Sequence, residues 1–150
     1  MKIFRKIILA IIGIWVLLSG AWFVWGRVTY SRYTDGMRQN AFSTPIVPRY
    51  YSADDTYTYF VKYPDYPMFI GNLAVSANDD AANVQAFLIW IPFIREKEYG
   101  LIIVDGSESH QIYTDVNGHP TDEQYTAVTD KYAEEIEKMV QSAKKMWNIE

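Results

Sequence analysis

One long apolar run near the start of the chain dominates the hydropathy pattern. Nineteen consecutive uncharged residues, Ile7 to Trp25, follow the basic residues Lys2, Arg5 and Lys6. A helix rises about 1.5 Å per residue, so this run spans about 28 Å, close to the roughly 30 Å hydrocarbon core of a bilayer. We therefore predict a single transmembrane helix over residues 7–25, in contact with membrane lipid.

The basic residues on the two sides of the run bear on its orientation. Three Lys or Arg residues precede the run and three follow it closely, so the count alone favours neither side. The leading cluster directly adjoins the first apolar segment, which usually dominates, and long downstream domains cross largely regardless of charge. We therefore expect a cytoplasmic N-terminus and an extracytoplasmic C-terminal domain. Aromatic residues typical of the headgroup zone mark the exit end, namely Trp22, Trp25, Tyr30 and Tyr33.

A cleaved signal peptide is the alternative interpretation of this segment. The basic start, the apolar stretch 7–18 and the small residues Ser19 and Ala21 match the three parts of such a peptide. Against cleavage, residues 22–25 continue the apolar run past that site and make it long enough to span a membrane. Cleavage near Ala21 would give a secreted protein instead of an anchored one.

Beyond the apolar run, the pattern becomes polar and then alternates with a period of two. Residues 30–55 are mostly polar and include Gly36, Pro45 and Pro48, which predicts a juxtamembrane connector rather than a helix. Alternation then predicts a first strand over residues 56–63.

Four further apolar segments, bounded by turn residues, complete the predicted sheet. The most apolar segment is 84–94, which is too short for a second membrane span and rich in β-branched and aromatic residues, so we expect a buried strand. Short turns at 95–98 and at Asp105-Gly106 predict an antiparallel meander of the last three strands. The strand segments after the first are Met68 to Ser76, Val84 to Ile94, Tyr99 to Val104 and Ser109 to Thr114, and the Ala81-Ala82-Asn83 segment could form a turn of helix.

The last thirty residues have the period of a helix. Thr121 followed by Gln124 matches a capping box, and an apolar stripe recurs at steps of three and four. The stripe comprises Tyr125, Val128, Tyr132, Ile136, Met139, Ala143 and Met146. We therefore predict an α+β fold: an N-terminal transmembrane helix, then an antiparallel sheet of four or five strands packed by one long C-terminal amphipathic helix. The expected division is 1–29 for the basic flank and anchor, 30–55 for the connector and 56–150 for the extracytoplasmic domain.

Charge and composition narrow the function of this domain. Residues 1–42 carry six Lys or Arg and one Asp, whereas residues 43–150 carry eight Lys or Arg and seventeen Asp or Glu. An acidic body argues against nucleic-acid binding, which depends on cations that neutralise phosphates, and against lying flat on an anionic leaflet. The chain has no cysteine and no Asn-x-Ser/Thr sequon, so we expect no disulfide and place it in a bacterial envelope.

The residues capable of chemistry form no recognised motif. The two histidines, His110 and His119, lie near Asp105, Glu108 and Asp115, but no ligand spacing recurs. The segment 115–118 starts like a calcium loop, yet its glycine comes two positions early and no glutamate closes the loop. Ser109 and His110 are neighbours on a strand and point to opposite faces, which defeats a nucleophile–base pair. We therefore expect no enzyme activity, no metal and no cofactor.

Tyrosines are the most unusual part of the composition. There are twelve, and six of them fall within residues 50–66. Tyrosine offers a large contact area at little cost in side-chain entropy and is enriched at binding surfaces. The candidate binding surface is Tyr57, Tyr59, Tyr63 and Tyr66. The alternatives are that this face of the first strand is core, or that the rings lie near the membrane.

The sequence thus predicts a single-pass cell-membrane protein with a non-catalytic extracytoplasmic domain. Its expected role is that of an accessory or assembly subunit, or a binding module, of a bacterial envelope complex with a protein partner at the membrane. A secreted or anchored inhibitor or immunity-type protein is the second hypothesis, and an envelope hydrolase is the third. Anchoring favours the first, cleavage near Ala21 the second, and a cleft with converging carboxylates the third.

Overall fold

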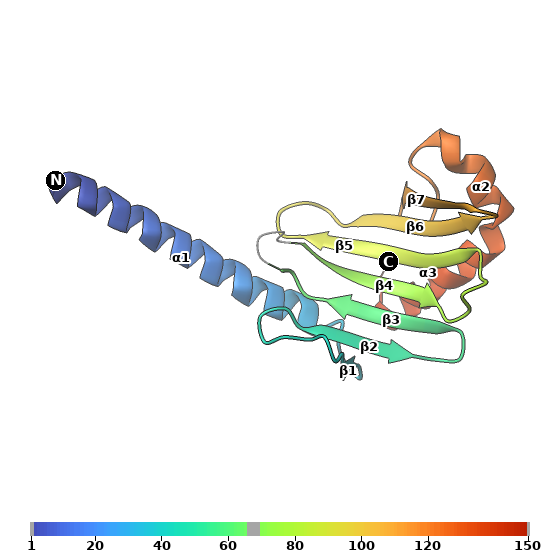
Figure 1. Cartoon of the computed structure of the whole chain (residues 1–150), viewed down its shortest axis with the longest axis horizontal. Coiled ribbons are helices and arrows are strands. Elements are labelled where there is room, and N and C mark those ends of the chain that lie inside the picture. The colour runs from blue at the N-terminus through green and yellow to red at the C-terminus, as the bar shows by residue number, and fades with distance from the viewer. Residues whose placement is uncertain (1, 66–69, 150) are drawn as a thin grey trace.

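The computed structural model describes residues 2–65 and 70–149 and has an α+β architecture (Figure 1). A long helix, α1 (Lys2–Ser31), leads into a sheet, and three short helical elements close the chain: the 3₁₀ turn η1 (Glu123–Tyr125), α2 (Thr126–Lys131) and α3 (Ala133–Trp147). The strands are β1 (Arg38–Gln39), β2 (Arg49–Ala53), β3 (Tyr57–Lys62), β4 (Ile70–Ala77), β5 (Val84–Pro92), β6 (Glu98–Asp105) and β7 (Glu108–Thr114).

The seven strands form one antiparallel meander in chain order, because each strand pairs with the next through a short connection. Gly106, at φ +64°, accepts the left-handed conformation needed in the tight β6–β7 hairpin. A bulge between Val84 and Ala86 shifts the alternation in β5, so that Val84 faces the same side as Phe87.

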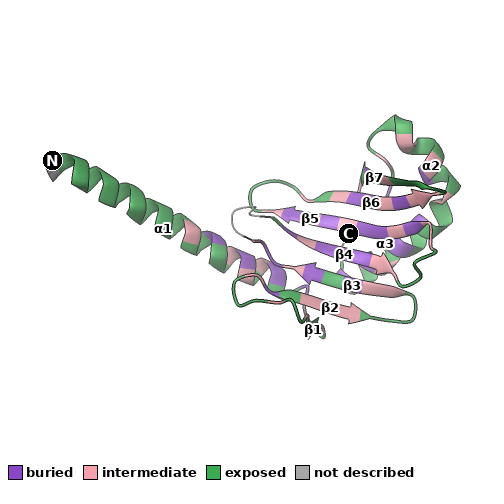
Figure 2. Ribbon diagram, viewed as in Figure 1, coloured by how far each residue is buried: buried purple, intermediate pink, exposed green. Residues whose placement is uncertain are grey.

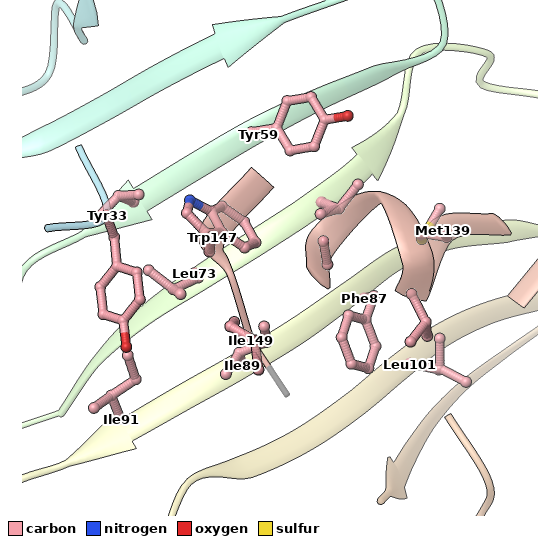
Figure 3. Close-up of a cluster of buried hydrophobic side chains, with 14 of the residues drawn as sticks. Tyr33, Tyr59, Leu73, Phe87, Ile89, Ile91, Leu101, Met139, Trp147 and Ile149 are labelled. Atoms are coloured by element: carbon pink, nitrogen blue, oxygen red, sulfur yellow. The ribbon is translucent and has the colours of Figure 1, made fainter. Parts of the chain in front are cut away.

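One face of the sheet carries the core. Helix α3 packs on this face, and Figure 3 shows its Met139 and Trp147 meeting Phe87 and Leu73 of the strands. Ile149, just beyond the end of α3, is buried in the same cluster. Burial of apolar side chains at this helix–sheet interface is the main stabilising contribution to the body.

The C-terminal part of α1 belongs to the same core, whereas its N-terminal part does not. Residues 3–18 are exposed, and burial begins at Trp22, as the change of colour along α1 in Figure 2 shows. Tyr30 is fully buried, and its hydroxyl donates a hydrogen bond of 2.9 Å to the Ile91 carbonyl. Gly71 makes this fit feasible, because a Cβ there would lie 2.6 Å from the Tyr30 ring.

The number of strands is seven, so the prediction of four or five was wrong. The two additional strands, β1 and β2, lie within residues 30–55, which we had predicted as a connector. Their residues are polar and flanked by Pro45 and Pro48, so no alternation of apolar residues signalled them. Tyr33 is buried and Tyr50 packs against the core, so this segment is part of the folded body.

The C-terminal helix is interrupted where one long helix was predicted. Tyr132 has φ −114° and ψ 22°, which separates α2 from α3 although the apolar stripe continues through this position. The cap is also different. Asp122 caps η1 by accepting from the Gln124 amide, while the Thr121 amide and hydroxyl bind the Tyr113 carbonyl of β7.

Smaller differences concern the loops and strand ends. Residues 81–83 form a turn and not a helical turn. The predicted strand 68–76 is present from Ile70, and Met68 lies outside the described residues.

We expect Gly71→Ala to destabilise the protein by about 1–3 kcal/mol, because the added methyl group overlaps Tyr30 and the Lys62 carbonyl. Thermal unfolding of the full-length protein in detergent, followed by circular dichroism, measures this. Gly20→Ala on α1 is the matched control, since its Cβ meets nothing within 4 Å. Equal melting temperatures for the two variants would contradict the fit of Tyr30 on Gly71.

Ile136→Asp should unfold the body, because a carboxylate would replace a side chain that is only 5% exposed between α3 and the sheet. The same substitution at Ile94, which is 88% exposed, is the control and should leave the melting curve unchanged. A cooperative, wild-type melt of Ile136→Asp would show that α3 does not cover the sheet.

Candidate functional site

The structure buries two of the four tyrosines of the predicted binding surface. Tyr59 and Tyr63 are 6% and 5% exposed and belong to the core cluster, and Tyr57 is half-buried against it. Tyr66 lies outside the described residues. The described members of this set therefore correspond to the core alternative and leave little ring surface for a partner.

A cluster of four tyrosine rings joins α1 to the sheet, and Tyr63 is the member that belongs to the predicted binding surface. The Tyr63 ring lies 5.4 Å from Tyr30 and 5.8 Å from Tyr50, centroid to centroid, and the Arg27 guanidinium lies 5.6 Å from its centroid. Tyr33 contacts Tyr30 edge to face at 6.4 Å. Aromatic pairs of this geometry stabilise beyond their burial, so the tyrosine cluster fixes the orientation of α1 on the body.

Tyr59 takes part in a hydrogen-bond chain that could be mistaken for a catalytic one. Its hydroxyl donates to Asp54 Oδ2 at 2.7 Å and lies 2.5 Å from the Ser142 hydroxyl of α3. A serine nucleophile needs an adjacent base, but burial raises the pKa of the Tyr59 hydroxyl, which stays protonated and points its proton at Asp54. The hydrogen bonds among Ser142, Tyr59 and Asp54 therefore hold α3 to the β2–β3 turn.

Asp54 also organises that turn. Its Oδ1 accepts from the amides of Thr56 and Tyr57 at 2.8 and 2.7 Å. The hydrogen bond donated by the Tyr57 backbone N–H lowers the pKa of Asp54 below its usual value, and the hydrogen bond from the Tyr59 hydroxyl lowers it further. The Asp54 carboxylate therefore serves the fold by holding this turn together.

The two histidines lie in different environments. His119 Nδ1 is 3.0 Å from Asp115 Oδ2, and His110 Nε2 is 3.7 Å from Glu108 Oε2. The His110 ring packs 6.2 Å from the ring of Tyr125 on the helix side of β7. Within residues 2–65 and 70–149, no three His, Cys, Asp or Glu side chains are grouped as a metal ion would require.

The segment 115–118 is a turn in the structure. Asp115 Oδ1 accepts from the amides of Asn117 and His119, and Gly118 has φ +88°. A hollow of about 430 Å³ between this turn and α3 is lined in part by Asp130 and Glu137. Asp115 therefore holds its own turn together.

The other face of the sheet, which Figure 1 shows toward the viewer with α3 behind, has no helix on it in the described part of the chain. We call its apolar part the open face; it consists of Phe60, Ile70, Leu88, Trp90, Ile102, Val104 and Tyr113. Phe60, Ile70 and Tyr113 are 37%, 40% and 58% exposed, and the other four are partly exposed.

Cross-strand pairing joins much of the open face into one row. Phe60 pairs with Ala74, Ala74 with Leu88, Leu88 with Gly100, and Gly100 with Tyr113. Trp90 lies over Gly100, where a Cβ would come within 2.9 Å of its ring, and it reaches Tyr113 at 5.8 Å. Polar residues surround this row, including Lys62, Asn72, Glu98 and Gln111. An aromatic centre with a polar rim is the usual composition of a protein-binding surface.

Sequence reasoning did not identify this surface, although a signal was present. In β5 the apolar residues Leu88 and Trp90 alternate with the core residues Phe87 and Ile89, so both faces of the strand are apolar. A strand of this kind is normally covered on both sides. The single amphipathic helix predicted for the C-terminus can cover only one of the two faces, so the pattern indicates a second apolar face without a helix on it.

Comparisons with protein-family models, with curated proteins and with solved structures give no match to this chain. The functional argument therefore depends on the geometry of the chain itself.

When the pH is lowered, the stability of the wild type should decrease more steeply than that of Asp54→Asn. The lowered pKa of Asp54 means that its ionised form contributes stability above about pH 4, and this contribution is lost as pH falls through the folded-state pKa. Melting temperatures at about pH 7 and about pH 3 give the comparison. Asp55→Asn leaves the hydrogen bonds of Asp54 in place and should behave like the wild type; identical slopes for all three proteins would contradict this role.

Proposed function

We propose that this chain is a single-pass protein of a bacterial cell membrane, with its N-terminus in the cytoplasm and its body outside. In this proposal the body is a non-catalytic binding module that joins a membrane protein through the open face. The observation that carries the proposal is the continuity of α1, which is apolar and exposed at one end and built into the core at the other.

The exposure of α1 supports an anchor. Among the described residues, one helix, Ile3–Ser31, is long and apolar enough to cross a membrane. A buried helix of a soluble protein would have its apolar side chains covered, whereas those of residues 3–18 are exposed all round. In water this surface would be far larger than the apolar patches of ordinary soluble monomers, and lipid removes that cost.

The continuity of α1 argues against cleavage after Ala21. This bond lies in the middle of a continuous helix, and the next residue, Trp22, is 8% exposed against the body. Uncleaved anchoring supports the role of an accessory or binding subunit over that of a released inhibitor.

The orientation of the sheet supports a partner in the same membrane. Figure 1 shows α1 leaving the body roughly along the direction of the strands. If α1 crosses the bilayer, the strands stand away from the membrane surface and the open face looks sideways, toward neighbouring proteins. A surface in this position meets the extracytoplasmic part of another membrane protein more readily than a ligand that arrives from above.

Site-specific photo-crosslinking in intact cells tests this proposal. A photoreactive residue at Gln111, on the open face, should crosslink to another membrane protein, and one at Glu137, an exposed residue of α3 on the other side of the sheet, should not. Tyr113→Ser should reduce the Gln111 crosslink at least several-fold, because exposed aromatic anchors carry much of the binding energy in such interfaces.

Three outcomes would contradict the proposal. Equal crosslinking from Gln111 and Glu137, or crosslinks only between copies of this chain, would remove the open face as a heterologous docking surface. N-terminal sequencing of the protein isolated from the same cells gives the second check, since a mature chain that starts at Trp22 would exclude the anchor and favour the secreted alternative.

A further inference from the structure

We propose that the end of the body beside α1 is embedded in the headgroup region of the bilayer, through the β1–β2 loop (residues 40–48) and the β5–β6 loop (residues 93–97). The occupant of this surface is the lipid that surrounds α1. The inference rests on the proposed anchoring of α1 and adds that the body itself binds the membrane.

The length of α1 that is free of the body is shorter than the predicted span. The body begins to cover one side of α1 at Trp22, so the part of the apolar run that lies ahead of the body is Ile7 to Ala21, which is fifteen residues, while Phe23, Val24 and Val28 stay 43%, 60% and 69% exposed beside the body. The part ahead of the body measures about 22 Å along the helix, against a hydrocarbon core of about 30 Å. A short span is accommodated by thinning of the bilayer, by snorkelling of flanking residues, or by drawing the attached body toward the membrane.

The two loops lie at the level where the apolar run ends. The Phe93 ring contacts the Trp25 ring edge to face, with 4.8 Å between centroids. Ile46 lines a small hollow together with Trp22 and Gly26. The Arg27 guanidinium donates to the Pro45 carbonyl, which fixes the β1–β2 loop against the same turns of the helix. No spacer therefore separates the body from the bilayer surface.

The side chains at these loop tips are suited to lipid. Ile94 is 88% exposed, Ile46 is 66% exposed and Phe93 is 43% exposed. Large apolar residues at exposed loop tips are costly in water and favourable at the boundary between headgroups and acyl chains. Figure 1 places both loops at the end of the sheet from which α1 extends.

Charge distinguishes this end of the body from the other. Arg95 and Lys97 alternate with Glu96 and Glu98 at the β5–β6 loop, and Arg27 and Arg49 add positive charge beside the β1–β2 loop. The turns at the opposite end carry acidic residues, namely Asp54, Asp55, Asp79, Asp80, Asp105 and Glu108. An anionic surface attracts the first end and repels the second, so the body stands on its α1 end although it is acidic as a whole.

Depth-dependent fluorescence quenching tests the inference on the full-length chain, which has no native cysteine and so permits single-cysteine labelling. The probe is a small fluorophore on Ile94→Cys or Ile46→Cys, in vesicles of phosphatidylcholine and phosphatidylglycerol that contain spin-labelled lipid. Leu17→Cys is the reference within the anchor, and Ser107→Cys, in the β6–β7 hairpin, is the reference far from the membrane.

We expect Leu17 to be quenched by lipid labelled near the chain end, and Ile94 and Ile46 to be quenched by lipid labelled near the headgroup. Ser107 should not be quenched by either lipid. Ile94→Asp in the Ile46→Cys protein should lower quenching at position 46 by about half or more, because one apolar contact is replaced by a charge that the anionic surface repels. This variant should fold normally, since Ile94 is almost fully exposed.

The possible outcomes separate the two proposals. Quenching at Leu17 without quenching at Ile94 and Ile46 would overturn the embedded loops and leave the anchor intact. No quenching at Leu17 would overturn both. A fluorescence change at Ile94 that depends on protein density and not on labelled lipid would assign this surface to a second copy of the chain and overturn the lipid contact.

Discussion

The fit of Tyr30 against Gly71 determines how the rest of this protein is arranged. A fully buried ring occupies the space that a side chain at position 71 would take, and its hydroxyl satisfies the Ile91 carbonyl. Burial raises the pKa of this hydroxyl, so it remains a donor at all physiological pH values. This contact turns α1 from a flexible tether into a structural element of the body.

The change from exposed helix to core helix takes place within a short stretch of α1. Among residues 3–21 all side chains are exposed except the partly buried Ser19, whereas Trp22, Gly26 and Tyr30 are buried on successive turns. Arg27 closes the junction through its contacts with the Phe23 and Tyr63 rings and with the β1–β2 loop. One helix therefore has an exposed apolar part at its N-terminal end and a part packed in the protein core at its C-terminal end.

The sequence predicted those features that depend on strong local patterns. The apolar run, the alternation in β3 and the turn at Asp105-Gly106 have clear physical signatures, and the helix and the meander followed from them. The two-residue β1 and the polar β2 have no such signature, since β2 depends on pairing with β3 and β1 on pairing with β2. Tyr132 keeps the apolar period while its backbone leaves the helix, so the break between α2 and α3 was not visible either.

The candidate site was harder to predict than the fold. The tyrosines around Tyr63 were conspicuous in the composition, yet composition does not tell which side of a strand is covered. That depends on where α1 and α3 pack, which are contacts between residues distant in the chain. The double-sided apolar pattern of Leu88 and Trp90 was readable, but its meaning required knowing that only one layer of helix is present.

Because α1 is one continuous helix, it also fixes the rotation of the sheet about the helix axis relative to the exposed part of α1. Each residue added to the helix ahead of Trp22 would turn the body by about 100° about the helix axis and move it by about 1.5 Å. If α1 crosses a bilayer as proposed, a neighbour that contacts α1 within it also sets the direction in which the open face points. Contacts inside the membrane and contacts outside it would then be geometrically coupled.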